Sequence, residues 1–491
     1  MTSGIDRARR KARHSAGSDV LRLASGITVA QILGLLMAPV YSRLFDAEAF
    51  GLSALFASVT IVLGAAVCLG YQTAIMLPDN DREAGHLLLD CLLLSMLVGL
   101  LVWGVAPALL RSLRGRQDTD LPTMLAGAWG LVVGITGVVQ SFRVWNNRLD
   151  RMRPLAWAPI AWALALAAFR LIGAGVGWDG GQVLILSQVV AKSANALVQV
   201  GFGLSAAIVH WRKATLSDLW RPLRRWSRFP RYALWGELLN SVSRQVPVFL
   251  LTWDFGAETV GLYAMAYRVV GFPGVLLRAA IGQVFLRRAT EAHREGNLGS
   301  LTARTLEHLV VLGSMGFVAG ACVGDVAFGI VFGPDWVPAG RMAQLICLSQ
   351  WATFLAAPLV NVCVVLERQD VSLGLNLALL VGRGLMLAFG GMLGGPLLAV
   401  GLFVAWGVLV WIGFLGWVLR ATDAALHLER EARRNLVRGA LLLACCLAAR
   451  LAAGSDWLVL AVAVAAVTLY YALALRAYPV RAWLGLEKRR A

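Results

Sequence analysis

The sequence has few charged residues and no long polar stretch. Only 15% of its 491 residues are charged, whereas a soluble protein carries about 25%. Hydrophobic residues make up 58% of the chain, and the mean hydropathy is +0.69. Because no segment is polar and long enough to form a separate soluble domain, the composition excludes an ordinary soluble globular protein.

Sequence features of common enzymes and metal sites are missing as well. No Gly-x-x-x-x-Gly-Lys-Ser/Thr motif is present, so the chain does not hydrolyse ATP by a P-loop. Its seven cysteines lie in apolar runs without Cys-x-x-Cys or Cys/His spacing, and we interpret them as small buried side chains. The sequence therefore predicts no catalytic residue, no cofactor and no metal.

What the sequence does contain is a series of apolar runs, and a helix needs about 20 such residues to cross a bilayer. The runs lack the two-residue alternation of strands. They cover residues 20–43, 50–77, 87–110, 121–142, 155–177, 182–209, 232–253, 259–286, 305–332, 342–366, 372–393, 396–419, 437–453 and 457–477. We therefore predict an all-α polytopic membrane protein of about 14 transmembrane helices.

Lysine and arginine are unevenly distributed between the loops. If the first residue is cytoplasmic and the helices alternate in direction, the inside segments hold 33 Lys and Arg, and the outside loops hold five. Positively charged loops stay on the cytoplasmic side, so this asymmetry predicts an even number of helices and cytoplasmic N- and C-termini. We interpret the net charge of +17 in the same way, and not as a nucleic-acid-binding surface.

A ten-residue motif occurs twice. Phe45-Asp-Ala-Glu-Ala-Phe-Gly-Leu-Ser-Ala54 follows the first run, and Phe255-Gly-Ala-Glu-Thr-Val-Gly-Leu-Tyr-Ala264 follows the seventh, with six identities at an offset of 210. An even number of helices separates the copies, which predicts parallel repeats. The predicted parts are a basic cytoplasmic tail at 1–19, six-helix lobes at 20–209 and 231–420, cytoplasmic linkers at 210–230 and 421–436, two further helices at 437–478, and a cytoplasmic tail at 479–491.

The linker 210–230 is the longest connection. Arginines fall largely between a set of apolar residues that recur at helical spacing, namely Leu216, Leu219, Trp220, Leu223 and Trp226. The pattern predicts an amphipathic helix in the inner membrane interface. The alternative is a solvated basic linker.

Ionisable residues inside the apolar runs are the candidates for function, because each costs about 2.5–3.5 kcal/mol at the bilayer centre. One deep anion, Glu237, stands against six deep cations, which are Arg170, Lys192, Arg244, Arg268, Arg278 and Arg383. Several polar residues share a helical face with Lys192 or Arg244. We predict that these residues line the same cavity: Gln188, Asn195, Gln199, Asn240 and Ser241.

The excess of positive charge predicts an anionic substrate, since a wet cationic cavity suits a diphosphate or an acidic sugar. A cavity for organic cations would show the reverse. Glu237 lies seven residues before Arg244, and it is either a proton-coupling carboxylate or the neutralising partner of that arginine. For each arginine, the alternative is a structural contact with a backbone carbonyl or a neighbouring helix.

The first 80 residues resemble the opening of bacterial polysaccharide exporters. The similar segments are Leu23-Ala-Ser-Gly-Ile-Thr-Val-Ala-Gln-Ile-Leu33, Pro39, Arg43-Leu-Phe-Asp-Ala-Glu-Ala-Phe-Gly-Leu52, Gly70-Tyr71, Ala74-Ile-Met-Leu-Pro78 and, in the second copy, Ala257-Glu-Thr-Val-Gly-Leu-Tyr-Ala264. These exporters are the Wzx-type oligosaccharide flippases of the multidrug/oligosaccharidyl-lipid/polysaccharide exporter superfamily. The length and the expected 14 helices of this chain agree with that family.

The resemblance implies two bundles around a V-shaped central cavity that opens alternately to each side. It implies a substrate linked to undecaprenyl diphosphate, which is turned outward for O-antigen, capsule or exopolysaccharide synthesis. It also implies a bacterial inner-membrane location, and as partners the lipid-linked glycan, the bilayer and polysaccharide polymerase or export machinery. The helices at 437–478 would shield a groove for the polyprenyl tail. The predicted function is therefore transport without catalysis.

Two alternatives make different demands on the sequence. A drug or cation antiporter of the same fold would carry a deep acidic cluster. A polytopic enzyme of envelope polysaccharide assembly would carry a carboxylate or histidine pair in a large outside loop, and the longest outside loop here, 111–120, has about ten residues.

Overall fold

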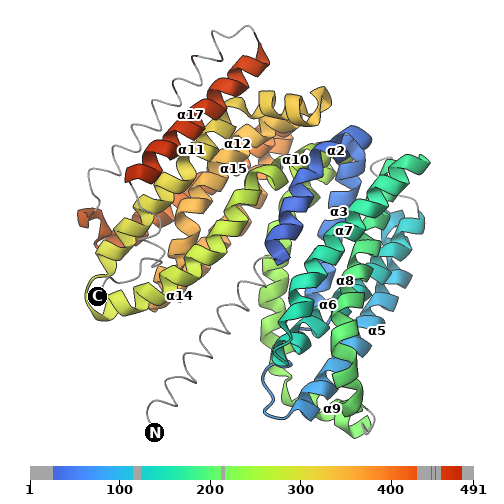
Figure 1. Ribbon diagram of the computed structural model, residues 1–491. Coiled ribbons are helices and arrows are strands. Elements are labelled where there is room, and N and C mark those ends of the chain that lie inside the picture. The colour runs from blue at the N-terminus through green and yellow to red at the C-terminus, as the bar shows by residue number, and fades with distance from the viewer. Residues whose placement is uncertain are drawn as a thin grey trace. The chain divides into compact units, whose positions relative to one another are not determined.

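The structure is a computed structural model that describes residues 26–113, 123–211, 216–427, 444, 448, 450 and 455–477. Every regular element in these ranges is a helix (Figure 1). The chain divides into two compact units, Met1–Gly261 (unit 1) and Leu262–Ala491 (unit 2). The predicted all-α class is confirmed. The predicted lobe boundary within 210–230 stays a prediction.

Unit 1 consists mainly of long helices. The first span, Gly26–Leu44, ends in α2. The elements of the unit are α2 (Ala38–Leu44), α3 (Ala47–Ala66), α4 (Tyr71–Ala74), α5 (Asp81–Leu113), α6 (Thr123–Arg148), α7 (Met152–Val176), α8 (Gly180–Trp211), α9 (Leu216–Arg225), η1 (Phe229–Ala233) and the first part of α10 (Leu234–Arg294). The predicted run 50–77 is interrupted after α3, where Gly70 adopts a left-handed conformation before α4.

Unit 2 begins within α10 and continues through a second set of long helices. Its elements are α11 (Leu298–Phe332), η2 (Pro334–Trp336), α12 (Val337–Ala356), η3 (Ala357–Val360), α13 (Asn361–Val365), α14 (Gln369–Leu393), α15 (Pro396–Ala421), η4 (Ala424–His427) and α17 (Asp456–Ala477). Among the described residues, α11 packs on α12, α14 on α15, and α17 on α11.

The number of helices approaches the predicted 14. Ten helices in the described ranges are long and apolar enough to cross a membrane. In addition, α10 contains the predicted seventh and eighth helices, and α17 matches the fourteenth. The predicted thirteenth helix, 437–453, lies largely outside the described residues, as do both predicted tails and most of the linker 421–436.

Apolar side chains fill the interior of each unit. In unit 1, Phe142 and Trp145 of α6 are buried against α5 and the turn before α4. In unit 2, Phe354 of α12 packs beside Phe317 of α11, with ring centroids 5.9 Å apart. Five of the seven cysteines are described, and all five are free and buried as predicted, whereas Cys445 and Cys446 lie outside the described residues.

The two copies of the repeated motif each begin a helix. In the first copy, the Asp46 side chain accepts a hydrogen bond from the Ala49 amide at 2.9 Å and caps α3. The equivalent position in the second copy is Gly256, whose φ of 82° breaks the regular path of α10. This backbone conformation suits a glycine. The equivalent residues Asp46 and Gly256 therefore each lie where a helix of their copy begins.

The motif copies contact each other reciprocally inside unit 1. A Cβ on Gly51 would overlap the backbone carbonyl of Ala257, and a Cβ on Gly261 would overlap that of Ala47. Ala47 and Ala257 are equivalent in the repeat, as are Gly51 and Gly261. Small residues allow membrane helices to approach until their backbones touch. The duplicated sequence thus makes one contact twice, and we call it the reciprocal glycine contact.

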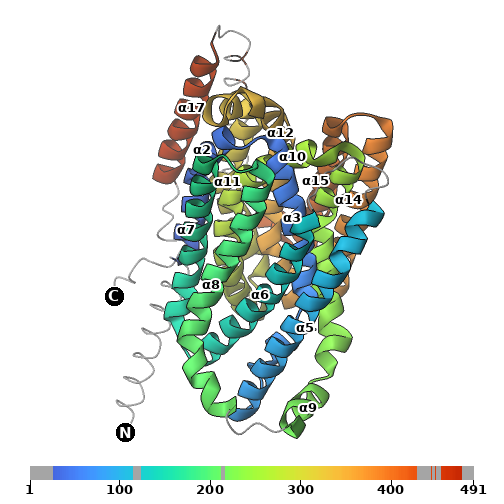
Figure 2. The same cartoon turned by 90° about the vertical axis from the view of Figure 1, so that its right-hand side faces the viewer.

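The amphipathic helix predicted in the linker is present as α9, which lies beside the start of α5 (Figure 2). Arg225 donates to Glu83 at 2.9 Å, and Trp226 Nε1 donates to the same carboxylate at 3.2 Å. The Tyr71 hydroxyl donates to the carbonyl of Leu223 at 3.0 Å. These bonds attach α9 to the helices of unit 1.

The C-terminal part of the chain is attached to α11. Arg450 donates to both carboxylate oxygens of Asp325, at 3.2 and 2.5 Å, and to the Cys322 carbonyl at 2.7 Å. The Tyr471 hydroxyl of α17 donates to the Leu312 carbonyl at 2.6 Å. Two charges that are far apart in the sequence therefore neutralise each other in unit 2.

Candidate functional site

The six predicted substrate-binding cations are distributed over both units. Arg170, Lys192 and Arg244 belong to unit 1, and Arg268, Arg278 and Arg383 to unit 2. Their surroundings differ. Arg170 holds neighbouring helices together, whereas Lys192 and Arg383 form no ion pair with a described carboxylate.

Arg170 of α7 is enclosed within unit 1. It is 5% exposed, its Nε donates to Ser187 of α8 at 3.0 Å, and its guanidinium lies 5.0 Å from the ring centre of Tyr41 in α2. A cation over an aromatic face is stabilised by the ring electrons. Arg170 therefore connects three helices, which corresponds to the structural alternative that the sequence left open.

The polar stripe on α8 is used largely for packing within unit 1. Gln188 donates to Ser53 of α3 at 2.8 Å, and Asn195 donates to the Ala158 carbonyl of α7 at 3.2 Å. Gln199 is 2% exposed and accepts a hydrogen bond from Asn146 of α6 at 2.9 Å. The three predicted cavity-lining amides thus each bind a different neighbouring helix.

Lys192 differs from the amides on its stripe. It is partly buried in the middle of α8, about 18 Å from the helix start at a rise of 1.5 Å per residue. Arg143 of α6, which has the same sign, is within its electrostatic reach. Among the described residues, no carboxylate forms an ion pair with Lys192. The Lys192 ammonium group therefore has no counter-charge paired with it in the described part of the chain.

The first part of α10 carries the second polar stripe. Arg244, Asn240 and Glu237 are exposed in this structure, whereas Ser241 is 1% exposed. In the described part of the chain, Glu237 and Arg244 form no ion pair with each other. The neighbouring Gln245 accepts a hydrogen bond from Ser58 of α3 at 2.8 Å. Arg244 is thus an accessible cation beside a side chain that fixes α10 to α3.

In unit 2, Arg383 lies among aromatic rings near the middle of α14. Its guanidinium is 5.4 Å from the ring centre of Phe403, and Tyr263 and Tyr267 are within electrostatic reach. The two tyrosine rings stack with centroids 5.8 Å apart. The Arg383 Nε is buried and makes no hydrogen bond within the described residues. The aromatic faces stabilise the cation but leave this Nε donor without an acceptor, which an anion would provide.

The remaining two cations give less information. Arg268 of α10 is exposed. Arg278 lies within the helical range of α10, but its side chain is outside the described residues. Among the residues that are described, no group of three or more His, Cys, Asp and Glu side chains is arranged to hold a metal ion.

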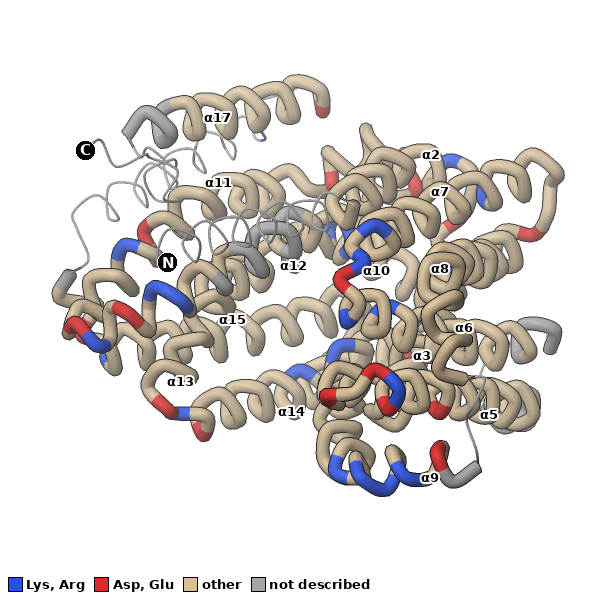
Figure 3. Tube along the Cα trace, turned by 60° about the horizontal axis from the view of Figure 1, so that its bottom comes forward, with Lys and Arg blue, Asp and Glu red and all other residues tan. Residues whose placement is uncertain are grey.

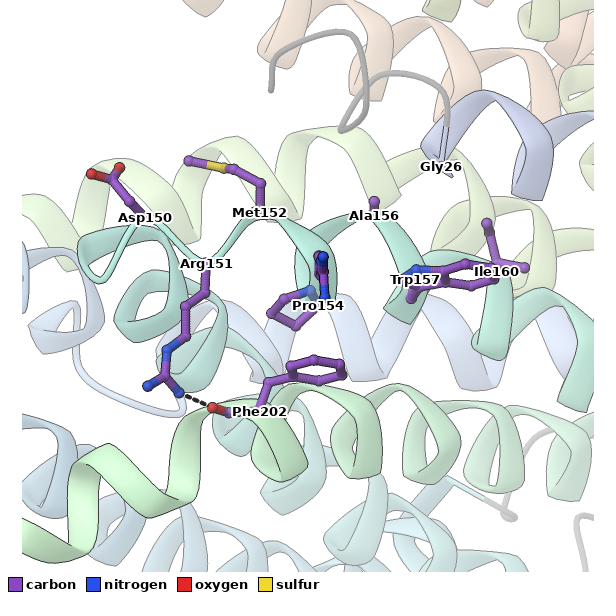
Figure 4. Close-up of a pocket in the computed structure, with 10 residues that line it drawn as sticks. Gly26, Asp150, Arg151, Met152, Pro154, Ala156, Trp157, Ile160 and Phe202 are labelled. Carbon is purple, nitrogen blue, oxygen red and sulfur yellow. Dashed lines mark hydrogen bonds between the residues drawn. The ribbon is translucent and has the colours of Figure 1, made fainter. Parts of the chain in front are cut away.

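A cavity of about 670 Å³ lies in unit 1, around the turn between α6 and α7 (Figure 4). Its lining includes Arg151, Arg153, Trp157 and Phe202, and Arg151 donates to the Phe202 carbonyl. None of the predicted substrate residues lines it. In the sequence these arginines are only topology signals, because Gly26 and Phe202, which complete the cavity, lie far from them along the chain.

Two further polar residues on α5 were not predicted as functional. Asp90 is 3% exposed and His86 is 5% exposed, although they lie one turn apart on an apolar helix. In each of them a buried polar atom, Oδ2 of Asp90 and Nε2 of His86, has no hydrogen-bond partner in the described structure. Their burial depends on the helices packed around the start of α5, and no local sequence pattern specifies those neighbours.

Comparison with known proteins agrees with this architecture. The family model described as polysaccharide biosynthesis protein matches residues 16–286. The teichuronic acid biosynthesis protein TuaB of Bacillus subtilis (strain 168) is 25% identical over 243 residues. That match covers 48% of this chain and 47% of TuaB, so the chain spans about half the length of this relative.

Solved structures share the fold over most of their length. The lipid II flippase MurJ, in an inward closed conformation, matches with a TM-score of 0.71 at 10% identity, over 92% of this chain and 98% of MurJ. An inward-facing multidrug resistance MATE family transporter of the MOP superfamily matches with a TM-score of 0.58 at 14% identity, over 83% and 98%. The chain is therefore a multi-pass membrane protein with the fold of these transporters, and it belongs to the polysaccharide biosynthesis protein family.

Proposed function

We propose that this protein flips an undecaprenyl-diphosphate-linked oligosaccharide across the bacterial cytoplasmic membrane, for O-antigen, capsule or exopolysaccharide synthesis. Membership of the polysaccharide biosynthesis family supports the glycan, and the fold of MurJ supports translocation. In this proposal both termini are cytoplasmic, and a polysaccharide polymerase or export machinery receives the product outside.

The observation that carries the proposal is the presence of mid-helix cations without an acidic partner. Lys192 in unit 1 and Arg383 in unit 2 have no ion pair among the described residues. An isolated charge in the bilayer core is expensive, so such residues are retained where an anion compensates them for part of the cycle. A diphosphate carries negative charge, which compensates the cation. Its oxygens also accept hydrogen bonds from the lysine and arginine side chains.

The cations then take different roles. We assign substrate contact to Lys192, Arg383 and the exposed Arg244 and Arg268, while Arg278 stays a candidate from sequence. Arg170 and the amides Gln188, Asn195 and Gln199 keep the helices of unit 1 in register through the contacts described above. The sugars and diphosphate cross through the protein, and the polyprenyl tail stays in the lipid.

Two roles were predicted for Glu237, proton coupling and neutralisation of Arg244. Glu237 forms no ion pair with Arg244 within the described residues, and this supports proton coupling as our proposal for this residue. If it is correct, Glu237→Gln will abolish the pH dependence of transport without changing substrate binding, measured in proteoliposomes.

The proposed function is tested by replacing the two cations. Lys192→Met and Arg383→Met keep side-chain length and apolar character but remove the charge. In a strain lacking the chromosomal copy, each variant should reach the membrane at a normal level. Because it is not flipped, the lipid-linked oligosaccharide should accumulate. Mass spectrometry of extracted lipids measures its amount and identifies it.

Arg287→Gln is the matched control, because the Arg287 side chain is 80% exposed and forms an ion pair with Glu291 one turn away. It should export normally. Normal export by both cation variants would refute the anion-binding proposal. Loss of resistance to organic cations, with unchanged lipid-linked glycans, would instead indicate the antiporter alternative.

A further inference from the structure

A second cavity, of about 350 Å³, lies between the start of α5 and the linker helix α9. Asn80, Glu83 and His86 come from the α5 side, and Arg221 and Arg225 come from α9. We call it the α5–α9 pocket. None of the proposed substrate cations lines it, and it belongs wholly to unit 1.

The pocket contains a buried polar group without a partner. His86 is 5% exposed, and its Nε2 makes no hydrogen bond within the described structure. A buried nitrogen of this kind is destabilising until it is given a partner. Leu87 and Leu88 beside it on α5 are apolar, and the carboxylates of Glu83 and Asp90, each within about one turn, form no hydrogen bond with this nitrogen in the described structure. The histidine therefore indicates a ligand that reaches it through the pocket.

The charges of the pocket favour an anion. The acidic residue Glu83 is already satisfied by Arg225 at 2.9 Å and by the Trp226 indole. Arg221 is exposed and forms no ion pair with any described residue. Arg82 and Asp218 also line the pocket, and because their charges are opposite, together they add no net charge to it. One arginine is thus left without a counter-charge beside a histidine without a partner.

The surroundings of the pocket indicate where the anion comes from. Basic residues follow each other along α9 (Figure 3), and on the same short helix Trp220 is 66% exposed. A helix with exposed tryptophan and several arginines lies at the membrane–water interface. The linker is predicted to lie on the cytoplasmic side of the membrane. There α9 would rest against the inner leaflet, whose lipids carry negative charge.

We propose that the α5–α9 pocket binds the headgroup phosphate of an anionic phospholipid of the inner leaflet, with His86 and Arg221 as hydrogen-bond donors. The acyl chains remain beside α9, and the lipid fixes the linker helix against α5. This site is separate from substrate transport, and it does not depend on which glycan is carried.

The test measures lipid binding and not export. Full-length protein in detergent is titrated with phosphatidylglycerol, and bound lipid is counted by native mass spectrometry while thermal unfolding is followed in parallel. Phosphatidylglycerol should bind and stabilise the protein, and phosphatidylcholine should not. Arg221→Gln should weaken binding about tenfold, because a hydrogen bond between two charged groups is lost.

Arg224→Gln is the control, since Arg224 is an exposed arginine of the same helix that does not line the pocket. It should bind phosphatidylglycerol almost as well as the unaltered chain. Equal weakening in Arg221→Gln and Arg224→Gln would overturn the proposal and indicate general surface attraction. His86→Asn tests the second donor, and Arg221→Gln keeps the test valid if that buried change prevents folding.

A third comparison identifies the source of the phosphate. Inorganic phosphate at millimolar concentration should neither displace the phospholipid nor stabilise the protein to the same degree, because it lacks the chains that rest beside α9. If inorganic phosphate competes fully, the ligand is a soluble anion and the lipid assignment is wrong.

Discussion

Replacing Gly51 by alanine should destabilise unit 1, although alanine is the better helix former. Gly→Ala in a helix interior normally contributes about 0.5–1 kcal/mol of stability. At this position, however, the added Cβ would overlap the Ala257 carbonyl and lie 3.1 Å from the Ala257 Cα. Overpacking costs about 1–3 kcal/mol, and a backbone neighbour cannot rotate away. We expect a net loss of about 1–2 kcal/mol.

Gly261→Ala should have the same effect, because its Cβ would overlap the Ala47 carbonyl and lie 2.9 Å from the Gly51 amide nitrogen. The double variant should lose less stability than the sum of the losses in the two single variants, because one separation of α3 from α10 relieves both overlaps. Coupling between contacting residues is commonly about 0.5–3 kcal/mol. The assay is unfolding of purified protein in detergent, followed by tryptophan fluorescence.

Gly201→Ala on α8 provides the control, because nothing lies within 4 Å of a Cβ at that position. It should leave stability unchanged or raise it slightly. If Gly51→Ala behaved like Gly201→Ala, or if the double variant lost the full sum, the reciprocal glycine contact would not hold α3 against α10.

Three other changes follow from contacts in the structure. Asp325→Asn removes the partner of Arg450; it should lower the melting temperature, and Arg450→Met in the same protein should recover part of the loss, a coupling of about 1 kcal/mol because Arg450 is partly exposed. Asn146→Ala leaves the buried Gln199 Oε1 without its donor and should cost about 1–3 kcal/mol in the same unfolding assay, whereas Asn147→Ala, on the exposed neighbouring residue, should cost little. Glu83→Gln weakens the attachment of α9; trypsin should cut the linker faster than in Glu291→Gln, and an unchanged cleavage rate would show that other contacts hold this helix.

Much of the fold could be predicted because the bilayer imposes one length on every crossing. The runs 155–177 and 372–393, for example, correspond closely to α7 and α14. The ends of elements were harder, since they depend on local geometry. The predicted helices 232–253 and 259–286, for example, lie in α10 on either side of Gly256, whose non-helical backbone bends the chain between them.

The candidate site could be predicted only in part. Helical spacing placed Gln188, Asn195 and Gln199 on one face, but it could not show that three different helices would meet them. The partners of Arg170 are 17 and 129 residues away in sequence, and no local pattern connects them. Spacing along one helix identifies a face, whereas the neighbour of that face is decided by the rest of the fold.

The reciprocal glycine contact also bears on how such a chain arose. Gly51 meets Ala257 while Gly261 meets Ala47, so each copy of the motif presents the same two residues to the other. In a half-length ancestor, one surface would have recognised an identical surface on a second molecule, as in an isologous homodimer. Any mutation in that ancestor would have changed the interface at two symmetry-related places. Fusion into one gene would have freed the two halves to diverge, which accounts for aspartate at position 46 and glycine at position 256.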